Sequence, residues 1–224
     1  MKSKDIKILV LLAFFVAIEV ILANTPLGYV PIGAINATTL HIPVIIAGIL
    51  LGKKYGALIG FVFGLTSFMK ATFQPGITSF IFSPFYSLGE IHGNFFSLVL
   101  AFGPRILLGY LSGLMFEILP LKADLKVMIS AGFNTLLHTL LVMGGVYVFF
   151  ADEYAKALNV SINQILVIIT TVIMTNGIAE IIIAVIASLA VYRACYKIVG
   201  RMIDSSLIPT GKPVGLRHNP KRVA

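Results

Sequence analysis

Six long runs of apolar residues follow one another along this chain, separated by short polar connections. A run of about 20 predominantly apolar residues has the length and composition of a helix that crosses a lipid bilayer. The composition agrees, because 58% of the 224 residues are hydrophobic, 12% are charged and the mean hydropathy is +0.98. A soluble domain of this size has too little interior to bury so much apolar surface. We therefore expect an integral membrane protein.

The apolar runs give approximate bounds for the helices. We expect an all-α integral membrane protein whose six helices form one compact bundle over residues 1–200. A polar and basic tail, residues 201–224, follows and is expected to be disordered. The second and third helices are short, and the sixth is long enough to project beyond the membrane. The predicted spans are Ile6–Ala23, Ala34–Leu51, Tyr55–Met69, Phe95–Ile118, Val127–Phe150 and Ile162–Tyr192.

The lysines and arginines lie mainly in alternate connections, and this predicts the orientation. The three connections on the opposite side contain a single lysine, Lys156. Cytoplasmic connections are enriched in Lys and Arg, so we expect both termini in the cytoplasm. The formal net charge of +8 then reflects topology rather than nucleic-acid binding. The basic connections hold Lys2, Lys4, Lys7, Lys53, Lys54, Lys122, Lys126, Arg193, Lys197 and Arg201.

Polar side chains interrupt the apolar runs, mostly in their outer halves. Polar groups inside a membrane are expensive and therefore indicate a functional site. Two cations among them, Lys70 and Arg105, favour a ligand with a carboxylate or phosphate, because a guanidinium binds a carboxylate through two hydrogen bonds. The start of the second span adds free backbone N–H groups. The candidate substrate-binding residues are Asn36, Thr38, His41, Lys70, Asn94, Arg105, Asn134, His138 and Asn176.

Each candidate also has a purely structural interpretation. Lys70 ends a span and can extend to the outer water. Arg105 can form a structural ion pair with Glu19 or Glu180. The polar side chains can instead cap a helix or tie neighbouring helices together. This alternative applies to Asn36, Thr38, Asn134 and His138.

Motifs of enzymes and metal sites do not occur in the sequence. "LLGKKYG" lacks the spacing and the Ser or Thr of a phosphate-binding loop, so the chain is not expected to hydrolyse ATP. Neither H-E-x-x-H nor G-x-S-x-G is present. Cys195 is the only cysteine, which excludes a disulfide framework within the chain. We expect no metal, no cofactor and no enzymatic activity.

Small residues recur at four-residue spacing on two predicted helices. Gly56, Gly60 and Gly64 form a ladder that lets another helix approach closely, and we expect that helix to belong to the same bundle. Ala13 and Ala17 lie on one face of the first span. We expect this face to contact a partner protein.

The order of these features resembles the substrate-binding S component of an energy-coupling factor (ECF) vitamin transporter. The resemblance covers about Ile6 to Arg201. Its carriers are the Ala-x-x-x-Ala face, "TTLHIPVIIAGILLGKKYGALIGFVFGLTSF", the outer loop ending in "SPFYSLGEIHGNFFS", and "GPRILLGYLSG". The segments "GAINATTLHIPVII" and "SFIFSPF" look most like the pantothenate members of the family.

The resemblance implies a mechanism and a location. Such a protein is a multi-pass component of the bacterial cell membrane and captures its vitamin from outside. It docks through the Ala13 and Ala17 face onto a transmembrane T component that carries two cytoplasmic ATPases, and it topples in the membrane to release the vitamin. The loops after spans one and three would cap the binding site. Pantothenate is the expected substrate, with a pyridoxine-type vitamin or riboflavin as the alternatives.

Two other function classes remain open at this stage. A stand-alone secondary transporter would couple to protons through Glu180 and His138, although no inverted repeat supports it. An intramembrane enzyme would need a catalytic pair from among His41, His138, Glu19 and Glu180, and it lacks a supporting motif.

Overall fold

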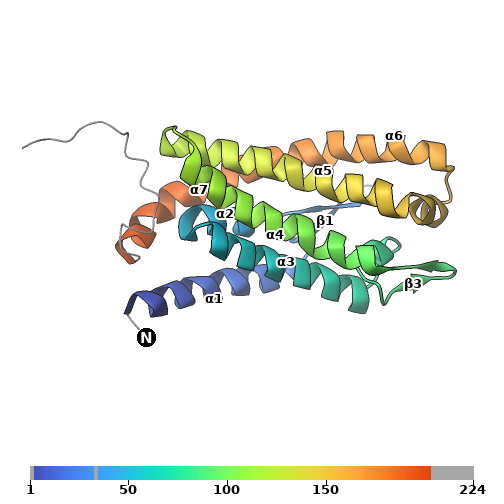
Figure 1. Cartoon of the computed structure of the whole chain (residues 1–224), viewed down its shortest axis with the longest axis horizontal. Helices are drawn as coiled ribbons and strands as arrows, with labels where there is room; N and C mark the ends of the chain where they lie inside the picture. The colour runs from blue at the N-terminus through green and yellow to red at the C-terminus, as the bar shows by residue number, and fades with distance from the viewer. Residues whose placement is uncertain (1–2, 33–34, 203–224) are drawn as a thin grey trace, which may run out of the picture.

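A computed structural model describes residues 3–32 and 35–202 of the chain, and helices dominate it (Figure 1). The predicted tail from residue 203 onward lies outside the described residues. The helices are α1 (Ser3–Ala23), α2 (His41–Leu51), α3 (Lys53–Phe73), α4 (Phe95–Ile118), α5 (Ala123–Leu158), α6 (Ile162–Val172) and α7 (Ile178–Met202), with the short helices η1 (Ser79–Ile81) and η2 (Ile173–Gly177). The strands are β1 (Tyr29–Ile32), β2 (Ile35–Thr38), β3 (Ser87–Leu88) and β4 (Ile91–His92).

Five helical stretches of the described chain are long and apolar enough to cross a membrane: Asp5–Ala23, Lys53–Phe73, Phe95–Ile118, Ala123–Leu158 and Ile162–Val199. The remaining predicted span, the second, corresponds to the shorter helix α2, which has 11 residues. The prediction of a mainly helical membrane bundle is therefore confirmed. A count of six complete spans and the membrane side of the termini stay predictions.

The beginning of the second predicted span was wrong. Residues Ile35–Thr38 form strand β2, which pairs with β1 in an antiparallel register from Tyr29 opposite Thr38 to Ile32 opposite Ile35. The stretch "INAT" combines β-branched residues with an Asn, which favours extended backbone over helix. The helix α2 begins only at His41.

Helix α5 extends beyond the predicted span at both ends. The prediction ended at Phe150, and Phe150 has non-helical backbone angles, φ −140° and ψ 19°, that mark a kink. Residues 151–158 continue as helix past the kink and end at Asn159, whose left-handed backbone (φ 56°) caps the helix. The predicted end of the span therefore coincides with the kink, and the helix continues beyond it.

The last predicted span is a helix with a π-helical interruption. Residues Ile173–Gly177 form the π-helical segment η2 between α6 and α7. A π-helical turn changes which side chains face a neighbouring helix and is frequent at functional sites. Here it makes Asn176 buried, whereas Met174 in the same segment is 60% exposed.

Helix α2 lies at the centre of the bundle, where it contacts α3, α4 and α7. Every residue of α2 except Ile42 is buried. The backbones of α2, α3 and α4 approach one another so closely that Gly48 and Gly109 leave no room for a side chain. A Cβ on Gly48 would lie 2.6 Å from the carbonyl oxygen of Gly109, and a Cβ on Gly109 would overlap the carbonyl oxygen of Gly56.

The glycine ladder of α3 packs against α4, as predicted. A Cβ on Gly60 would overlap the carbonyl oxygen of Arg105, and one on Gly64 would lie 2.8 Å from that of Ala101. Contacts this close require hydrogen in place of a side chain at these positions. The ladder therefore holds two helices of the same bundle together and is not available to a partner.

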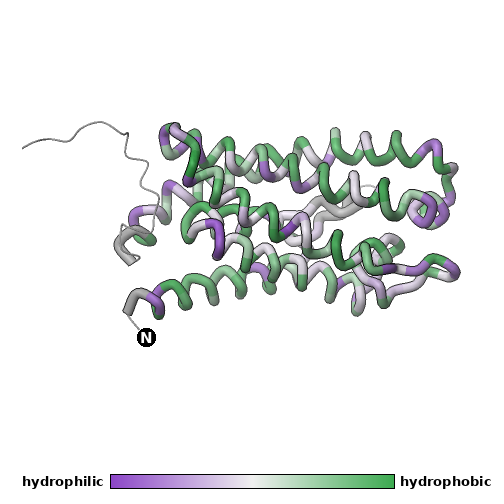
Figure 2. The backbone as a smooth tube through the Cα atoms, in the orientation of Figure 1, coloured by the Kyte–Doolittle hydropathy of each residue, from purple (hydrophilic) through white to green (hydrophobic). Residues whose placement is uncertain are grey.

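Both described ends of the chain lie at one end of the bundle. In Figure 1 the start of α1, the end of α7 and the α4–α5 turn are on the left, whereas the α5–α6 turn and the β3–β4 hairpin are on the right. Figure 2 shows green, hydrophobic backbone along most of the bundle and purple, hydrophilic segments concentrated toward its two ends. Two basic residues that were predicted to lie on the cytoplasmic side of the membrane form ion pairs. Lys53 pairs with Glu117 (2.7 Å), and Arg193 pairs with Asp124 (2.6 Å).

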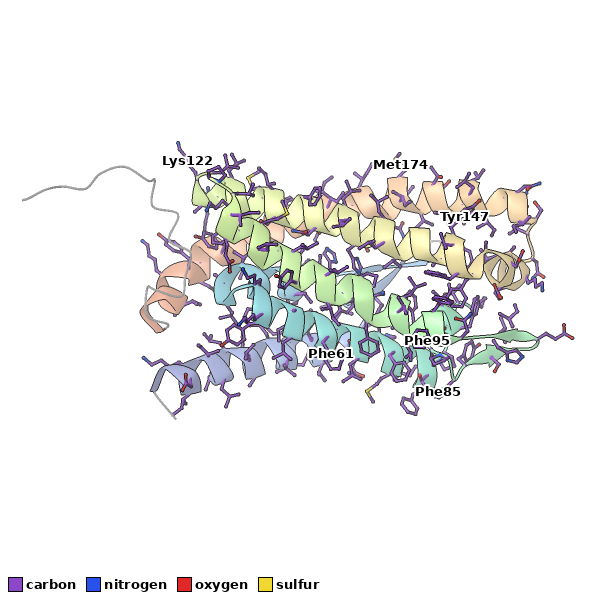
Figure 3. All side chains as sticks on the ribbon, viewed as in Figure 1. Phe61, Phe85, Phe95, Lys122, Tyr147 and Met174 are labelled. Carbon is purple, nitrogen blue, oxygen red and sulfur yellow. The ribbon has the colours of Figure 1, made fainter. Side chains whose placement is uncertain are left out.

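Large apolar side chains cover the outside of the bundle. Met174 and Phe85 lie at opposite edges of the molecule in Figure 3, and they are 60% and 76% exposed. In water such a surface would be unfavourable, and in a bilayer it faces acyl chains. The outward apolar surface agrees with a multi-pass membrane protein.

We predict that Gly109→Ala lowers the stability of the bundle by about 1–3 kcal/mol, because the added methyl group overlaps the α3 backbone. The measurement is the fraction of detergent-solubilised protein that still elutes as a monodisperse species after heating. Gly103→Ala is the matched control on the same helix, since a Cβ there meets no atom within 4 Å. Equal melting of the two variants would contradict the close packing.

Candidate substrate-binding site

A cavity of about 190 Å³ lies between α3, α4, α5, η2 and α7. The segment after α3 and the β1–β2 hairpin complete its wall, and both belong to the loops that the resemblance implies would cap the site. That segment is well packed, because Phe80 and Ile81 are 0% and 3% exposed and Ser97 donates a 2.6 Å hydrogen bond to the carbonyl of Phe80. The polar side chains of the lining are Tyr29, Thr38, Ser67, Lys70, Gln74, Thr78, Ser79, Arg105, His138, Thr139, Asn176 and Glu180.

Arg105 reaches the cavity from α4 and is only 5% exposed. Pro104 precedes it, and because proline has no N–H, the carbonyl of Leu100 loses its helical partner. Arg105 fills this gap by donating a hydrogen bond from Nη1 to Leu100. Its guanidinium lies 4.7 Å from the ring centre of Phe82 and 5.4 Å from that of Phe63. The sequence "GPR" thus both frees the acceptor and supplies the donor that fixes the guanidinium.

The guanidinium retains unused donor capacity. Its Nε has no hydrogen-bond partner in the described part of the chain. Among the described residues, neither Glu19 nor Glu180 forms an ion pair with Arg105. Glu19 is fully buried on α1 and lies outside the cavity lining. The described chain therefore contains no ion pair of the kind considered for Arg105, and this cation remains available to an anionic ligand.

Lys70 forms a second cationic position, on α3. Its Nζ donates a 3.3 Å hydrogen bond to the carbonyl of Ala23 and lies 4.3 Å from the ring centre of Tyr29. The Tyr29 hydroxyl is 3.1 Å from Ser67 Oγ. Burial raises the pKa of the Tyr29 phenol, so the hydroxyl is neutral at pH 7 and is able to donate a hydrogen bond. Lys70 thus contacts the segment after α1 in addition to lining the cavity.

The opposite wall carries an acidic group. Glu180 on α7 accepts a 2.8 Å hydrogen bond at Oε1 from the backbone N–H of Thr38. The hydroxyl of Thr139 shares its proton between Oε2 of Glu180 (3.3 Å) and the carbonyl of Thr135 on its own helix (3.1 Å). Through Thr38 this carboxylate also fastens the end of β2 to α7.

Besides Arg105, two polar side chains of the cavity lining have buried atoms without a hydrogen-bond partner in the described chain. Asn176 Oδ1 lies 3.2 Å from the hydroxyl of Thr175, which also donates to the carbonyl of Thr171 (2.8 Å), and Asn176 Nδ2 has no partner. His138 lies against Phe63, with ring centres 6.0 Å apart, and its Nε2 has no partner. Both residues line the cavity. Unsatisfied buried polar atoms are costly, and a bound polar ligand would supply the missing hydrogen bonds.

The structure brings some of the predicted site residues together and separates others. His41 is buried outside the lining, and Asn94 caps α4 by accepting a hydrogen bond from Phe96 N–H. Asn134 donates to the carbonyl of Ser130 (2.8 Å), and the side chain of Asn36 lies outside the described part. The predicted residues that line the cavity are Thr38, Lys70, Arg105, His138 and Asn176.

Several lining residues were absent from the predicted site. Ser67 lies one helical turn before Lys70, and Thr139 follows His138, so both were within reach of helical-face reasoning. Glu180 was recognised as an ionisable residue but considered only for an ion pair or a proton path. Tyr29 gave no signal, because only the hairpin brings it to the cavity.

The face of α1 that carries Ala13 and Ala17 lies on the outside of the bundle. Ala13 and Ala17 are exposed, and so are Val10 (57%), Phe14 (60%) and Ile21 (62%). In Figure 1 helix α1 forms the lower edge of the bundle, with α5 and α6 at the upper edge. Small residues among large apolar ones leave a shallow surface against which another helix can pack.

The described part of the chain contains no group of three His, Cys, Asp or Glu side chains placed to hold a metal ion. The cavity instead combines two cations, one carboxylate and several hydrogen-bonding groups with an apolar remainder. Such a site is suited to binding a small polar molecule.

Comparison with known proteins identifies the family. Residues 7–192 match the family described as "ECF transporter, substrate-specific component". The chain is 35% identical to the pantothenic acid transporter PanT of Lactococcus lactis over 199 residues, which cover 88% of this chain and 95% of that protein. It is 36% identical to the pantothenate transporter PanT of Leuconostoc mesenteroides over 122 residues, covering 52% and 54% of the two chains. The chain belongs to the substrate-specific S components of ECF transporters and is a multi-pass bacterial membrane protein.

Proposed function

We propose that this S component binds pantothenate in the cavity and delivers it to an ECF import complex. The observation that carries the proposal is Arg105, a buried cation in the cavity lining that has no carboxylate partner in the described chain and retains a free Nε–H. Pantothenate is a flexible anion with one carboxylate, an amide and two hydroxyl groups. Its carboxylate fits Arg105, and its amide and hydroxyls fit the unsatisfied Asn176 and His138.

The size of the cavity supports pantothenate over a larger vitamin. A volume of about 190 Å³ is below the roughly 300–1,000 Å³ that is usual for drug-sized ligands. Riboflavin, with three fused rings and a sugar-like chain, needs more room and more aromatic surface. The names of the two relatives, both pantothenate transporters, support the same choice.

Delivery across the membrane requires partners, because the sequence has no phosphate-binding loop. In this proposal the exposed face of α1 at Ala13 and Ala17 docks onto a T component that carries two ATPases. The end of the bundle with the termini faces the cytoplasm, and the end with the β3–β4 hairpin faces outward. Toppling of the docked protein then releases pantothenate inside.

The first prediction concerns the ligand itself. We expect protein purified in detergent from cells grown in rich medium to release pantothenate on denaturation, at near one-to-one stoichiometry by mass spectrometry. Calorimetry with the emptied protein should then show saturable binding of pantothenate, and not of riboflavin or pyridoxine. Release or binding of a different vitamin would overturn the substrate and keep the family.

The second prediction ranks the two cations. A hydrogen bond to a charged group is worth about 1.5–3 kcal/mol, or roughly 10- to 150-fold in affinity. Arg105→Met should weaken pantothenate binding by at least about this factor, and Lys70→Met by less, because Lys70 lies partly in water beside Tyr29. Arg193→Met, which removes an exposed arginine paired with Asp124 outside the cavity, is the control and should bind normally.

An analogue separates lost contacts from misfolding. Pantothenol carries a hydroxyl in place of the carboxylate, so it should bind the unaltered protein much more weakly than pantothenate does. Arg105→Met should lose this preference, because the group that recognises the carboxylate is gone. A variant that binds both ligands weakly and keeps the preference would show that another residue takes the carboxylate.

The third prediction concerns docking. Ala13→Trp and Ala17→Trp should abolish pantothenate uptake by cells that express the full complex, because the indole fills the shallow surface of α1. Pantothenate affinity of the purified variants should stay unchanged, since neither residue reaches the cavity. Gly144→Trp, at an exposed glycine of α5 with no atom within 4 Å of an added Cβ, is the control. Uptake by the Ala variants at the control rate would exclude this face as the docking surface.

A further inference from the structure

We infer that Glu180 determines the specificity of the cavity: it accepts hydrogen bonds from the hydroxyl end of the ligand and excludes ligands that carry a second anion at that end. The inference deepens the proposed function and rests on it. The observation behind it is that the described lining of the cavity contains one carboxylate, Glu180, beside the cations Lys70 and Arg105. Glu180 lies on α7, whereas Arg105 lies on α4.

Glu180 is held in place without being neutralised. The N–H of Thr38 donates to one of its oxygens (2.8 Å), and the hydroxyl of Thr139, which shares its single proton with the carbonyl of Thr135 (3.1 Å), lies 3.3 Å from the other. In the part of the chain that the structure describes, Glu180 has no ion pair with a lysine or arginine. Two neutral donors fix the orientation of the carboxylate and leave its negative charge in the cavity.

The carboxylate keeps acceptor capacity for a ligand. Two carboxylate oxygens offer about four lone-pair positions, and the two protein donors occupy two of them. The remaining positions suit hydroxyl or amide donors of a bound molecule. A hydroxyl that donates to a carboxylate makes a short and strong hydrogen bond.

The opposite charges on α4 and α7 set the direction of the ligand. Arg105 and Glu180 line the same cavity but form no ion pair with each other. A molecule with an anion at one end and hydroxyls at the other satisfies both groups only when its anion is at Arg105 and its hydroxyls are near Glu180. The reversed orientation would bring two anions together and leave the arginine unpaired.

The same arrangement excludes a phosphorylated ligand. Phosphorylation of the terminal hydroxyl of pantothenate would remove its donor and add close to two negative charges beside Glu180. Like charges at short range in a partly buried site repel strongly. The site would therefore select the free vitamin over its phosphate ester by charge as well as by size.

The test compares two ligands on three proteins. Calorimetry measures the dissociation constants of pantothenate and 4′-phosphopantothenate for the unaltered protein, for Glu180→Gln and for Glu117→Gln. The glutamine side chain in the first variant would retain an oxygen acceptor for Thr38 and the shape of the original side chain while removing the charge. Glu117 lies at the other end of α4 paired with Lys53, outside the cavity, and is the matched control.

We expect the unaltered protein and Glu117→Gln to bind the phosphate ester at least about 100-fold more weakly than pantothenate. In Glu180→Gln this ratio should fall by about tenfold or more, because the like-charge repulsion is gone. An unchanged ratio in Glu180→Gln, with pantothenate still bound, would overturn the inference and leave the proposed function standing. Failure of the unaltered protein to bind pantothenate would overturn both.

A second comparison needs no variant and covers the case in which Glu180→Gln fails to fold. The acetate ester of the same hydroxyl also removes the donor and adds bulk, but it carries no charge. On the unaltered protein it should bind at least about tenfold more tightly than the phosphate ester, because only the phosphate is repelled. Equal exclusion of the two esters would assign the selection to size and overturn the role of the charge.

Discussion

The close approach of α3 and α4 at their glycines is the constraint on which the rest of the structure depends. Gly56 and Gly109 meet backbone to backbone, and Gly60 lies against the carbonyl of Arg105 itself. This contact sets the depth at which α4 presents Arg105, and it leaves α2 enclosed between α3, α4 and α7. In a bilayer, where apolar surface finds apolar solvent everywhere, such packing is a main source of helix association.

Pro104 adds a fixed cation to this rigid contact. It removes one helical hydrogen bond and so leaves the Leu100 carbonyl as an acceptor for Arg105. The guanidinium is thereby fixed beside Phe63 and Phe82 with its Nε free. A buried cation that the protein leaves without an anion is unfavourable in the empty state. In the proposed function, binding of an anionic ligand would remove that cost and would link capture of the substrate to the stability of the bundle.

The proposed functions of the chain are spatially separated. The cavity collects its polar groups from α3, α4, α5, η2 and α7, together with the β1–β2 hairpin. The exposed small residues of α1 face away from it. A protein divided in this way can dock to a partner without disturbing its ligand. The hydrogen bond from Thr38 to Glu180 also connects the hairpin to α7 at the cavity wall, so a ligand at Glu180 would contact the same group that holds the hairpin.

The sequence by itself determined the membrane class, most of the helix bounds, the internal packing of the glycine ladder and the family. These follow from local properties, namely apolar length, small-residue spacing and motif order, which a chain carries before it folds. The same reasoning identified Lys70, Arg105, His138 and Asn176 as polar groups inside the bundle. Only the tertiary structure decided which polar groups meet. It replaced the start of the second span by a hairpin, gave Asn134 a partner on its own helix, and brought Tyr29 and Glu180 to the cavity, because each of these depends on how the folded backbone places its segments.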